Sequence, residues 1–292
     1  MSLKRQAQGF FKTLGLYERV KASRLYDLYW SRTDPHWITD RTKEVQFYRT
    51  ALAGMKRRDM IFDIGANSGL KTDVFLRLGA RVVAVEPDET NREVLKGKFL
   101  KNRVFPKPVT VEGKAVSDRE ERVSMLVDAP GSALNTLSPK WARALQSDPD
   151  RFGQQFEFTT RKIVETTTLE SLIEKHGFPF YVKIDVEGYE LNVLRGLKRA
   201  VPYLSFEVNL PEFKDEGLEC IDLLHRIAPD GEFNCVSDCS AGLKLATWLP
   251  VDEFLQTYRE CTESTLEVFW RNARLFEQNS PGELMETMGG KL

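Results

Sequence analysis

The chain has 292 residues, of which 41% are hydrophobic and 29% are charged, and its formal net charge is −1. This composition is ordinary for a globular protein, and the lack of a net basic field argues against a nucleic-acid-binding class. No apolar run approaches the roughly 18 residues that cross a membrane, and the apolar stretch 9–16 is interrupted by Lys12, so we expect neither a membrane span nor a secretory signal. The four cysteines form no CxxC pair, so we predict a reducing, cytoplasmic setting.

The first 58 residues carry helical patterns and no strand pattern. Apolar and aromatic side chains recur near helical spacing from Phe10 to Tyr29, the step Thr33-Asp34-Pro35 breaks the pattern, and a second helix is expected over 41–55. The segment holds 13 Lys and Arg against 5 Asp and Glu, which gives it a net charge of +8. We predict an N-terminal helical segment over 1–58, ahead of the main domain.

The most basic part of this segment is 1–24, where six Lys and Arg accompany a single acid, Glu18, and are interleaved with aromatic and aliphatic residues. A basic amphipathic helix can lie on an anionic membrane surface. It can also cover the core of its own protein as a lid, which is the commoner role of amphipathic helices and the interpretation we favour. Peripheral membrane contact through residues 1–24 stays open as the second interpretation.

From residue 59 onward, short apolar runs alternate with amphipathic helical patterns. The expected strands cover 60–64, 81–85, 109–116, 122–127, 163–167, 180–184, 203–208, 232–236 and 266–270. The expected helices cover 70–78, 90–100, 141–146, 169–175, 190–197 and 218–227. Strands separated by helices indicate βαβ units and a mostly parallel sheet, closed by an antiparallel pair of the last two strands. We predict one α/β domain over 59–275 and a flexible tail over 276–292.

The strongest motif joins the first strand to the helix that follows it. Asp63 ends the strand, and Gly65, Asn67 and Gly69 form the turn before the helix. Glycines allow a sharp turn and a close approach to a ligand, and a helix N-terminus offers free N–H groups to a carboxylate. Glu86 ends the second strand, where a carboxylate can accept both hydroxyls of a ribose. Together these positions suit a nucleoside with an amino-acid tail, which describes S-adenosylmethionine.

This motif has two other interpretations. A nicotinamide dinucleotide is the more serious rival, but the loop lacks the G-x-G-x-x-G spacing, because Asn67 and Ser68 occupy its middle. The plainer interpretation is a tight strand–helix turn with an unrelated surface Glu. We consider it the weaker one, since motif, context and downstream acid agree.

A second motif, KIDVEGYE, follows the buried strand over 180–184. Ligands bind at the carboxyl ends of strands in open α/β sheets, so Asp185 and Glu187 are expected near an active site. For Glu190 we favour a structural role at the start of a helix, where the helix dipole stabilises an acid.

A third polar group ends the next strand, where Glu207 and Asn209 point the same way. Asp185, Glu207 and Asn209 together could bind Mg²⁺, which prefers oxygen ligands. A carboxylate acting alone as the base is the interpretation we favour, so no metal is predicted. The polar loop with Ser132, Asn135 and Thr136 has two equally supported roles, contact with a sugar or ordinary turn chemistry.

The sequence resembles the FkbM-type methyltransferases. The resemblance is carried by IFDIGANSG with AVEP downstream, by the stretch from TTTLESLIEKHG to KIDVEGYELNVLRGL, and by the SFEVN and EVFWRN strands. It implies a Rossmann-like class I fold with a seven-stranded, mostly parallel sheet and helices on both faces, and S-adenosylmethionine as the methyl donor. Carried over by position, Asp63, Gly65, Asn67 and Glu86 would hold the cofactor.

For the reaction, the resemblance implies that Asp185 and Glu187 face the transfer site. It also implies O-methylation of a hydroxyl in a sugar, a glycan or a glycosylated natural product. Residues 1–43 and 238–262 match no usable family pattern, so acceptor specificity is expected to vary there. The alternatives are a Mg²⁺-assisted O-methyltransferase acting on a small molecule, and a non-catalytic cofactor-binding or membrane-docking module. The sequence does not specify the acceptor or the oligomeric state.

Overall fold

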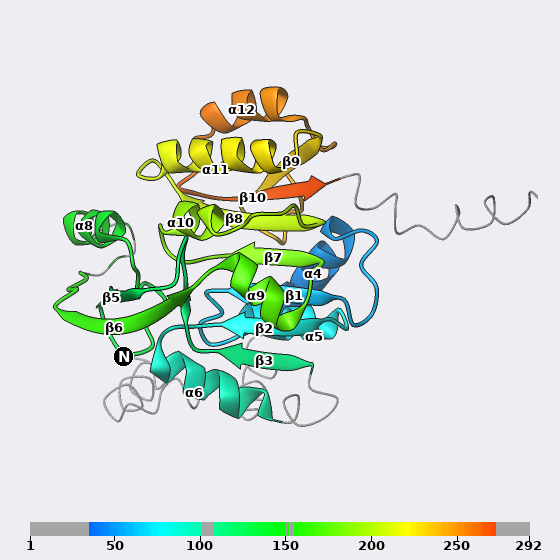
Figure 1. Cartoon of the computed structure of the whole chain (residues 1–292). Coiled ribbons are helices and arrows are strands. Elements are labelled where there is room, and N and C mark those ends of the chain that lie inside the picture. The colour runs from blue at the N-terminus through cyan, green and yellow to red at the C-terminus, as the bar shows by residue number, and fades with distance from the viewer. Residues whose placement is uncertain (1–34, 101–107, 150, 152, 154, 273–292) are drawn as a thin grey trace, which may run out of the picture.

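The structure is a computed structural model that describes residues 35–100, 108–149, 151, 153 and 155–272 (Figure 1). The helical pattern from Phe10 to Tyr29, the basic segment 1–24 and the predicted tail lie outside these residues. The first described element is helix α4, Pro35–Ala51, which overlaps the helix expected over 41–55. The boundary after residue 58 stays a prediction.

A seven-stranded sheet forms the centre of the molecule, with the strand order β3-β2-β1-β7-β8-β10-β9. Its strands are β1 Met60–Ile64, β2 Arg81–Val85, β3 Val109–Glu112, β7 Tyr181–Ile184, β8 Tyr203–Asn209, β9 Gly231–Val236 and β10 Thr265–Asn272. All neighbouring strands from β3 to β8 are parallel, whereas β10 runs antiparallel to both β8 and β9. The predicted mostly parallel sheet and its antiparallel closing pair are therefore confirmed.

The strand order changes direction at β1, which lies between β2 on one side and β7 on the other. In open α/β sheets this switch point leaves a crevice beyond the carboxyl ends of the two strands, because their connections diverge to opposite sides. The loops that follow β1 and β7 both begin at this crevice. The topology alone therefore brings the two strongest sequence motifs together.

A second, three-stranded sheet has the order β4-β6-β5, with β4 Ala115–Val116, β5 Arg122–Val127 and β6 Thr160–Thr167. The prediction of one strand over 109–116 is wrong, because β3 ends at Glu112 and β4 pairs with β6 instead. Gly113 separates the two pieces, and a glycine inside a strand pattern often marks such a break. The second sheet lies beside one end of the main sheet, on the left in Figure 1, and helix α8 lies next to it.

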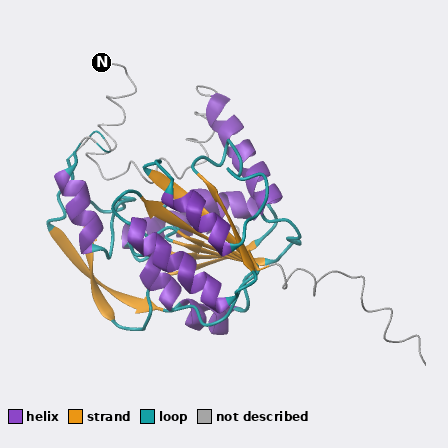
Figure 2. Cartoon of the chain, turned by 90° about the horizontal axis from the view of Figure 1, so that it is seen from above, coloured by secondary structure: helices purple, strands orange, loops and turns teal. Residues whose placement is uncertain are grey.

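Helices cover both faces of the main sheet, which Figure 2 shows nearly edge-on between them. Besides α4, the described helices are α5 Leu70–Arg77, α6 Glu89–Lys98, α8 Pro139–Ser147, α9 Leu169–His176, α10 Glu190–Arg195, α11 Lys214–Ile227 and α12 Val251–Arg259, of which α8 lies beside the second sheet (Figure 1). Helix α12 was not predicted, although Val251, Phe254, Leu255 and Tyr258 recur on it at helical spacing and all four pack against the core. Within the described ranges, none of the helices combines the length and apolarity that a membrane crossing requires.

Successive side chains of strand β1 point to opposite faces of the main sheet, and each face has its own apolar core. Phe62 and Ile64 point into a large apolar cluster, whereas Ile61 points into a second cluster on the opposite face. A strand that is buried on both faces reads as a continuous apolar run, which is why MIFDI is recognisable from sequence. The second cluster is closed by helix α4.

Tyr48 of α4 is the centre of this second cluster. Its side chain is fully buried, and its ring lies 5.1 Å from that of Phe75 and 6.0 Å from that of Tyr181, measured between centroids. Its hydroxyl is buried and has no hydrogen-bond partner among the described residues. Tyr48 therefore fixes helix α4 to the sheet by aromatic packing, without a hydrogen bond from its hydroxyl.

We predict that Tyr48→Ala lowers the free energy of unfolding by about 3–5 kcal/mol, because it leaves a cavity among the aromatic rings. Tyr48→Phe is the matched control and should be at least as stable as the wild type, because it removes an unpartnered hydroxyl. Urea unfolding measures both. A large loss with Tyr48→Phe would mean that the hydroxyl is satisfied, and a small loss with Tyr48→Ala would mean that α4 contributes little to the core.

Candidate active site

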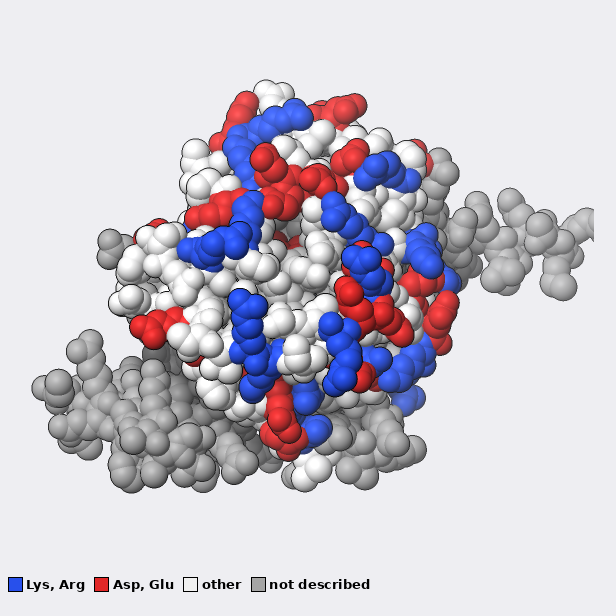
Figure 3. Space-filling view, turned by 60° about the vertical axis from the view of Figure 1, so that its left-hand side comes forward, with Lys and Arg blue, Asp and Glu red and all other residues white. Residues whose placement is uncertain are grey.

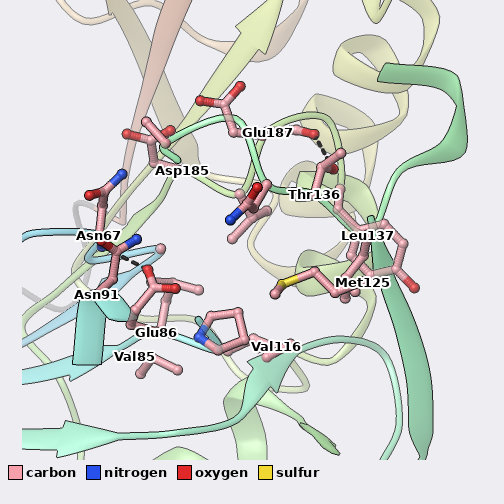
Figure 4. A pocket seen from close by; sticks show the side chains of 18 of the residues that line it. Asn67, Val85, Glu86, Asn91, Val116, Met125, Thr136, Leu137, Asp185 and Glu187 are labelled. Carbon is pink, nitrogen blue, oxygen red and sulfur yellow. Dashed lines mark hydrogen bonds between the residues drawn. The ribbon is translucent and has the colours of Figure 1, made fainter. Parts of the chain in front are cut away.

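A narrow cleft of about 130 Å³ opens at the switch point between β1 and β7. The loops after β1, β2 and β7 line one side of it, and Met125 together with the segment 132–137 lines the other. Figure 4 shows Asn67, Asn91 and Glu86 close to one another, with Asp185 and Glu187 above them and Met125, Thr136 and Leu137 across the cleft. The polar loop at 132–137 thus reaches the same cleft as both motifs.

The backbone of the β1–α5 loop requires glycine at its first position. Gly65 has φ +82°, and a Cβ atom there would lie 1.8 Å from the carbonyl oxygen of Asp185. The amides of Gly65 and Ala66 both donate to the carbonyl of Val85, at 3.0 Å each. Asn67 follows with φ +48°, a conformation that Asn tolerates better than most residues. The loop is therefore pressed directly against the loop that follows β7.

Two of the predicted cofactor residues, Asp63 and Gly69, do not line the cleft. Asp63 is 2% exposed and accepts a hydrogen bond from the Thr72 hydroxyl at 2.5 Å, which ties β1 to helix α5. Gly69 is the N-cap of α5, and a Cβ atom there would lie 2.6 Å from side-chain atoms of Leu95 and Phe99. Both residues shape the loop from beneath, whereas Gly65, Asn67 and Glu86 line the cleft as expected.

Glu86 is held in place by two backbone amides. Its carboxylate accepts hydrogen bonds from Asn67 N at 2.8 Å and from Asp88 N at 2.7 Å. Burial raises the pKa of Glu86 to about 7. Next to it, Asn91 is 2% exposed, and its side-chain oxygen has no hydrogen-bond partner within the described part of the chain. Two buried acceptors side by side suit a ligand with several hydroxyl or amino donors.

The loop after β7 begins with an ion pair. Lys183 is 3% exposed, and its ammonium group donates to Asp185 Oδ2 at 2.7 Å. Burial acts to raise the pKa of Asp185, but the charge and hydrogen bond of Lys183 outweigh it, so that this pKa lies below its usual value. Asp185 therefore stays ionised in the buried site.

Glu187 is fixed by the segment that covers the cleft. The Trp141 indole N–H donates to Glu187 Oε2 at 2.9 Å, and the Thr136 hydroxyl donates to the Glu187 carbonyl at 2.7 Å. Glu187 has φ +58°, an unusual value for a residue other than glycine. Such strain costs about 1–3 kcal/mol and is found mainly at functional sites.

Glu207 of β8 completes a group of three carboxylates. One carboxylate oxygen each of Asp185, Glu187 and Glu207 lies within 4.8 Å of the others. Burial, together with the negative charge of Asp185, raises the pKa of both Glu187 and Glu207 well above the usual value. The structure therefore brings together the two predicted catalytic residues and the acid singled out on the next strand, with one carboxylate ionised beside two that hold protons more tightly.

Glu190 has the structural role that the sequence indicated. Its side chain accepts hydrogen bonds from Val186 N at 3.1 Å and from Gly188 N at 3.2 Å, which closes the turn after β7. Burial raises its pKa to about 7. Gly188 in this turn has φ +83°, and a Cβ atom there would lie 2.4 Å from the ring of Phe213. Glu190 thus shapes the turn that presents Asp185 and Glu187.

The roles of Lys183 and Asn91 were not predicted from the sequence. A lysine within the apolar strand YVKI was a usable signal, because a buried ammonium requires nearby acids. Asn91 gave no signal, since it lies among polar residues of helix α6. Asn209, which the sequence grouped with Asp185 and Glu207, ends β8 and is buried, with 5% of its surface exposed.

Charges of both signs are mixed on one face of the molecule. On the face shown in Figure 3, acidic and basic side chains are interspersed, and acidic ones gather in the upper half of the view. A nucleic-acid site would present a continuous basic stripe instead. The face in view therefore offers no such stripe.

A methyltransferase family and several methyltransferases of solved structure resemble this chain. The model of the methyltransferase FkbM domain matches residues 63–230, more than half of the chain. A methyltransferase FkbM from Methylobacillus flagellatus KT is similar in structure, with a TM-score of 0.49 and 17% identity over 78% of this chain and 47% of that one. The chain thus spans about half the length of that protein. A search of the curated proteins found no match.

Two other solved structures resemble this fold more distantly. The C-terminal domain of precorrin-6Y C5,15-methyltransferase from Rhodobacter capsulatus has a TM-score of 0.37 and 13% identity, over 76% of this chain and 83% of that one. A TehB-like SAM-dependent methyltransferase from Corynebacterium glutamicum has a TM-score of 0.40 and 10% identity, over 84% of this chain and 99% of that one.

We predict that Lys183→Met lowers the free energy of unfolding at pH 7.5 by about 1–3 kcal/mol, because it removes the counter-charge and hydrogen-bond donor of Asp185, whose side chain is half-buried. Without the ammonium group the folded-state pKa of Asp185 rises above the unfolded value, so the stability of the variant increases as the pH falls. Urea unfolding at pH 7.5 and pH 5.5 measures both effects.

Lys96→Met provides the control, because Lys96 forms a surface ion pair with Glu93 and its loss should change stability by less than about 1 kcal/mol. A Lys183→Met protein as stable as the control at both pH values would contradict the role assigned to this ion pair.

Proposed function

The chain belongs to the FkbM methyltransferase family, and from that premise we propose that it transfers a methyl group from S-adenosylmethionine to a hydroxyl of a sugar, a glycan or a glycosylated natural product. The family match supports the use of S-adenosylmethionine by this methyltransferase. The choice of a hydroxyl acceptor rests on one observation above all, the three carboxylates that lie within 4.8 Å of one another at the edge of the cleft.

The residues of the cleft fit this cofactor. Glu86 and the unpartnered oxygen of Asn91 are the acceptors for the hydroxyl and amino groups of a nucleoside. Gly65 and Asn67 allow the backbone to approach the ligand closely. Asp63 and Gly69 act on this site through the loop that they shape. Asn91 is an addition to the residues predicted from sequence.

When bound, S-adenosylmethionine supplies a methyl group on a positively charged sulfur. An alcohol must lose its proton as its oxygen bonds to the methyl carbon, so a carboxylate at the transfer site accelerates the reaction. Asp185 is ionised but is a weaker base because Lys183 lowers its pKa, whereas Glu187 is a stronger base that holds its proton more tightly. We assign the base to this pair, and the remaining contribution of the protein is alignment of the reactants.

A divalent cation is the second candidate for activating the hydroxyl. The oxygen atoms of Asp185, Glu187 and Glu207 form a donor set that suits Mg²⁺. Lys183 weighs against it, because its ammonium group already compensates Asp185 at 2.7 Å. Full activity after treatment with a chelator would eliminate the cation, and activity that returns only with added Mg²⁺ would establish it.

The proposed acceptor is tested directly by incubating the protein with methyl-labelled S-adenosylmethionine and separated fractions of glycans, lipids, proteins and small molecules. We expect label in glycans or glycosylated molecules, as methyl ethers that resist mild alkali. Label recovered only in proteins or nucleic acids, or as alkali-labile esters, would contradict the proposal.

We predict that binding of S-adenosylmethionine weakens about tenfold between pH 8 and pH 6. The pKa of Glu86 is about 7 in the free protein, and a carboxylate that accepts ribose hydroxyls must be ionised, so the proton competes with the ligand. Glu86→Gln should bind weakly and lose most of this pH dependence, and Glu86→Ala should lose roughly 1–3 kcal/mol of binding free energy.

Isothermal calorimetry across this pH range measures these affinities. Circular dichroism on each variant first establishes that it is folded. An unchanged affinity in folded Glu86→Ala, or the same tenfold pH effect in Glu86→Gln, would show that Glu86 does not hold the ribose.

We predict that Asp185→Asn and Glu187→Gln each lower turnover while the affinity for S-adenosylmethionine stays nearly unchanged. The residue that accepts the proton should show the larger loss, about 10²- to 10⁴-fold. Glu219→Gln is the control, since Glu219 lies on the surface of α11 and pairs with Arg195. If both active-site variants turn over as fast as the control, the transfer site lies elsewhere.

A further inference from the structure

A second, wider pocket lies on the other side of Asp185. Its volume is about 560 Å³. Its walls come from α4, the start of α5, the ends of β7 and β8, β10 and the segment 236–240. Asp185 lines both this pocket and the cofactor cleft, so the two spaces meet at a carboxylate of the transfer site.

The residues that line the two pockets differ in how far the family model covers them. Every residue that lines the cofactor cleft falls between 64 and 189, inside the range 63–230 that the family model matches. Most of the second pocket falls outside that range, namely Arg41 and Glu44 on α4, the segment 236–240, Thr265 and Glu267. Members of a family that use the same cofactor are expected to bind it with residues inside the matched range. Residues that bind an acceptor specific to this chain are expected outside that range.

The chemistry of the second pocket is polar and contains both donors and acceptors. Lys71, in the first turn of α5, forms an ion pair with Glu44 of α4 and so joins these two helices. On the opposite wall, Glu267 accepts a hydrogen bond from the Ser205 hydroxyl at 2.6 Å. Leu70 is 54% exposed at the same pocket and offers an apolar surface. Hydrogen-bond donors and acceptors beside an apolar surface suit a sugar ring, because the hydroxyl groups at the edge of the ring are polar and its face is apolar.

The charge of the pocket narrows the class of acceptor. Three basic and five acidic side chains line it, and all three basic groups are already paired with carboxylates, Arg41 with Asp73, Lys71 with Glu44 and Lys183 with Asp185. A phosphate or carboxylate on the acceptor would face an excess of acids without an unpaired cation to bind it. A neutral or amino-bearing ring meets no such penalty.

We infer that this pocket holds the methyl acceptor, that the acceptor is a neutral or amino-bearing sugar ring, and that Lys71 and Glu267 determine its binding. The inference rests on the proposed function, since it names the place and charge class of the acceptor for the same reaction. The reacting hydroxyl would lie next to Asp185, between the two pockets. The ion pair of Lys71 with Glu44 makes helix α4 part of the acceptor site.

The test compares charged residues of two neighbouring pockets. Lys71→Met and Glu267→Gln alter the inferred acceptor pocket. Lys140→Met and Glu216→Gln are the controls, because Lys140 pairs with Glu216 beside a separate pocket of about 280 Å³ that also reaches Glu207. For each protein, calorimetry measures the affinity for S-adenosylmethionine, and methyl transfer measures the KM for a neutral methyl glycoside, an amino sugar and a sugar phosphate.

We expect the wild type to use the neutral or amino sugar and not the sugar phosphate. Lys71→Met and Glu267→Gln should raise the acceptor KM at least tenfold, with the affinity for S-adenosylmethionine changed less than twofold, and the controls should match the wild type. Sugar binding in the presence of S-adenosylhomocysteine, followed by ligand-observed NMR, should weaken in the same two variants.

The outcomes separate this inference from the proposed function. If the wild type methylates sugars but Lys71→Met and Glu267→Gln keep its KM, or the controls lose affinity instead, the acceptor binds elsewhere while the function stands. A preference for the sugar phosphate would overturn the charge class. If the wild type neither binds nor methylates any sugar while it still binds S-adenosylmethionine, the proposed function itself fails, and this inference fails with it.

Discussion

The active site depends on one buried positive charge at the end of β7. Lys183 is 3% exposed, donates to Asp185 at 2.7 Å and lies beside Asp63 in the register of β1 and β7. An ammonium group with this burial is costly unless acids surround it, and the acids are equally costly without the ammonium group. Glu207 and Glu267, together with Asp185, act to keep the pKa of Lys183 high although burial acts to lower it. Lysine and acids therefore stabilise each other at the edge where the methyl group would be transferred.

The second constraint is the direct contact between the loops after β1 and β7. Gly65 leaves no room for a side chain beside the carbonyl of Asp185, so the backbone that would hold the cofactor packs directly against the backbone that presents the carboxylates. Glu190 closes the second loop from within, and Trp141 fixes Glu187 from the covering segment. Catalysis by alignment needs this rigidity, because small displacements of the reacting groups reduce the rate strongly.

The sequence predicted those features that depend on local pattern. The buried strand MIFDI, the glycine turn after it and the acids after β7 follow from apolar runs that end in polar residues at strand ends. The division of 109–116 between two sheets depends on pairing with β6, a contact distant in sequence. Helix α12 was missed although its apolar residues Val251, Phe254, Leu255 and Tyr258 do recur at helical spacing, so a local pattern was available there. The sequence indicated 1–43 and 238–262 as regions that vary with the acceptor, but not that α4 and segment 236–240 line one pocket, because they meet only in the folded chain.

The claim that Lys183 divides the carboxylates into one ionised and two proton-holding groups can be measured directly. Proteins labelled with ¹³C at the carboxyl carbons of Asp and Glu can be titrated by NMR, with Asp185→Asn, Glu187→Gln and Glu207→Gln used to assign the signals. The account predicts that Asp185 titrates below its usual pKa of 3.8, and that Glu187 and Glu207 titrate above 4.5. If all three groups titrate at their ordinary values, or if Asp185 titrates last, the buried lysine does not organise this site.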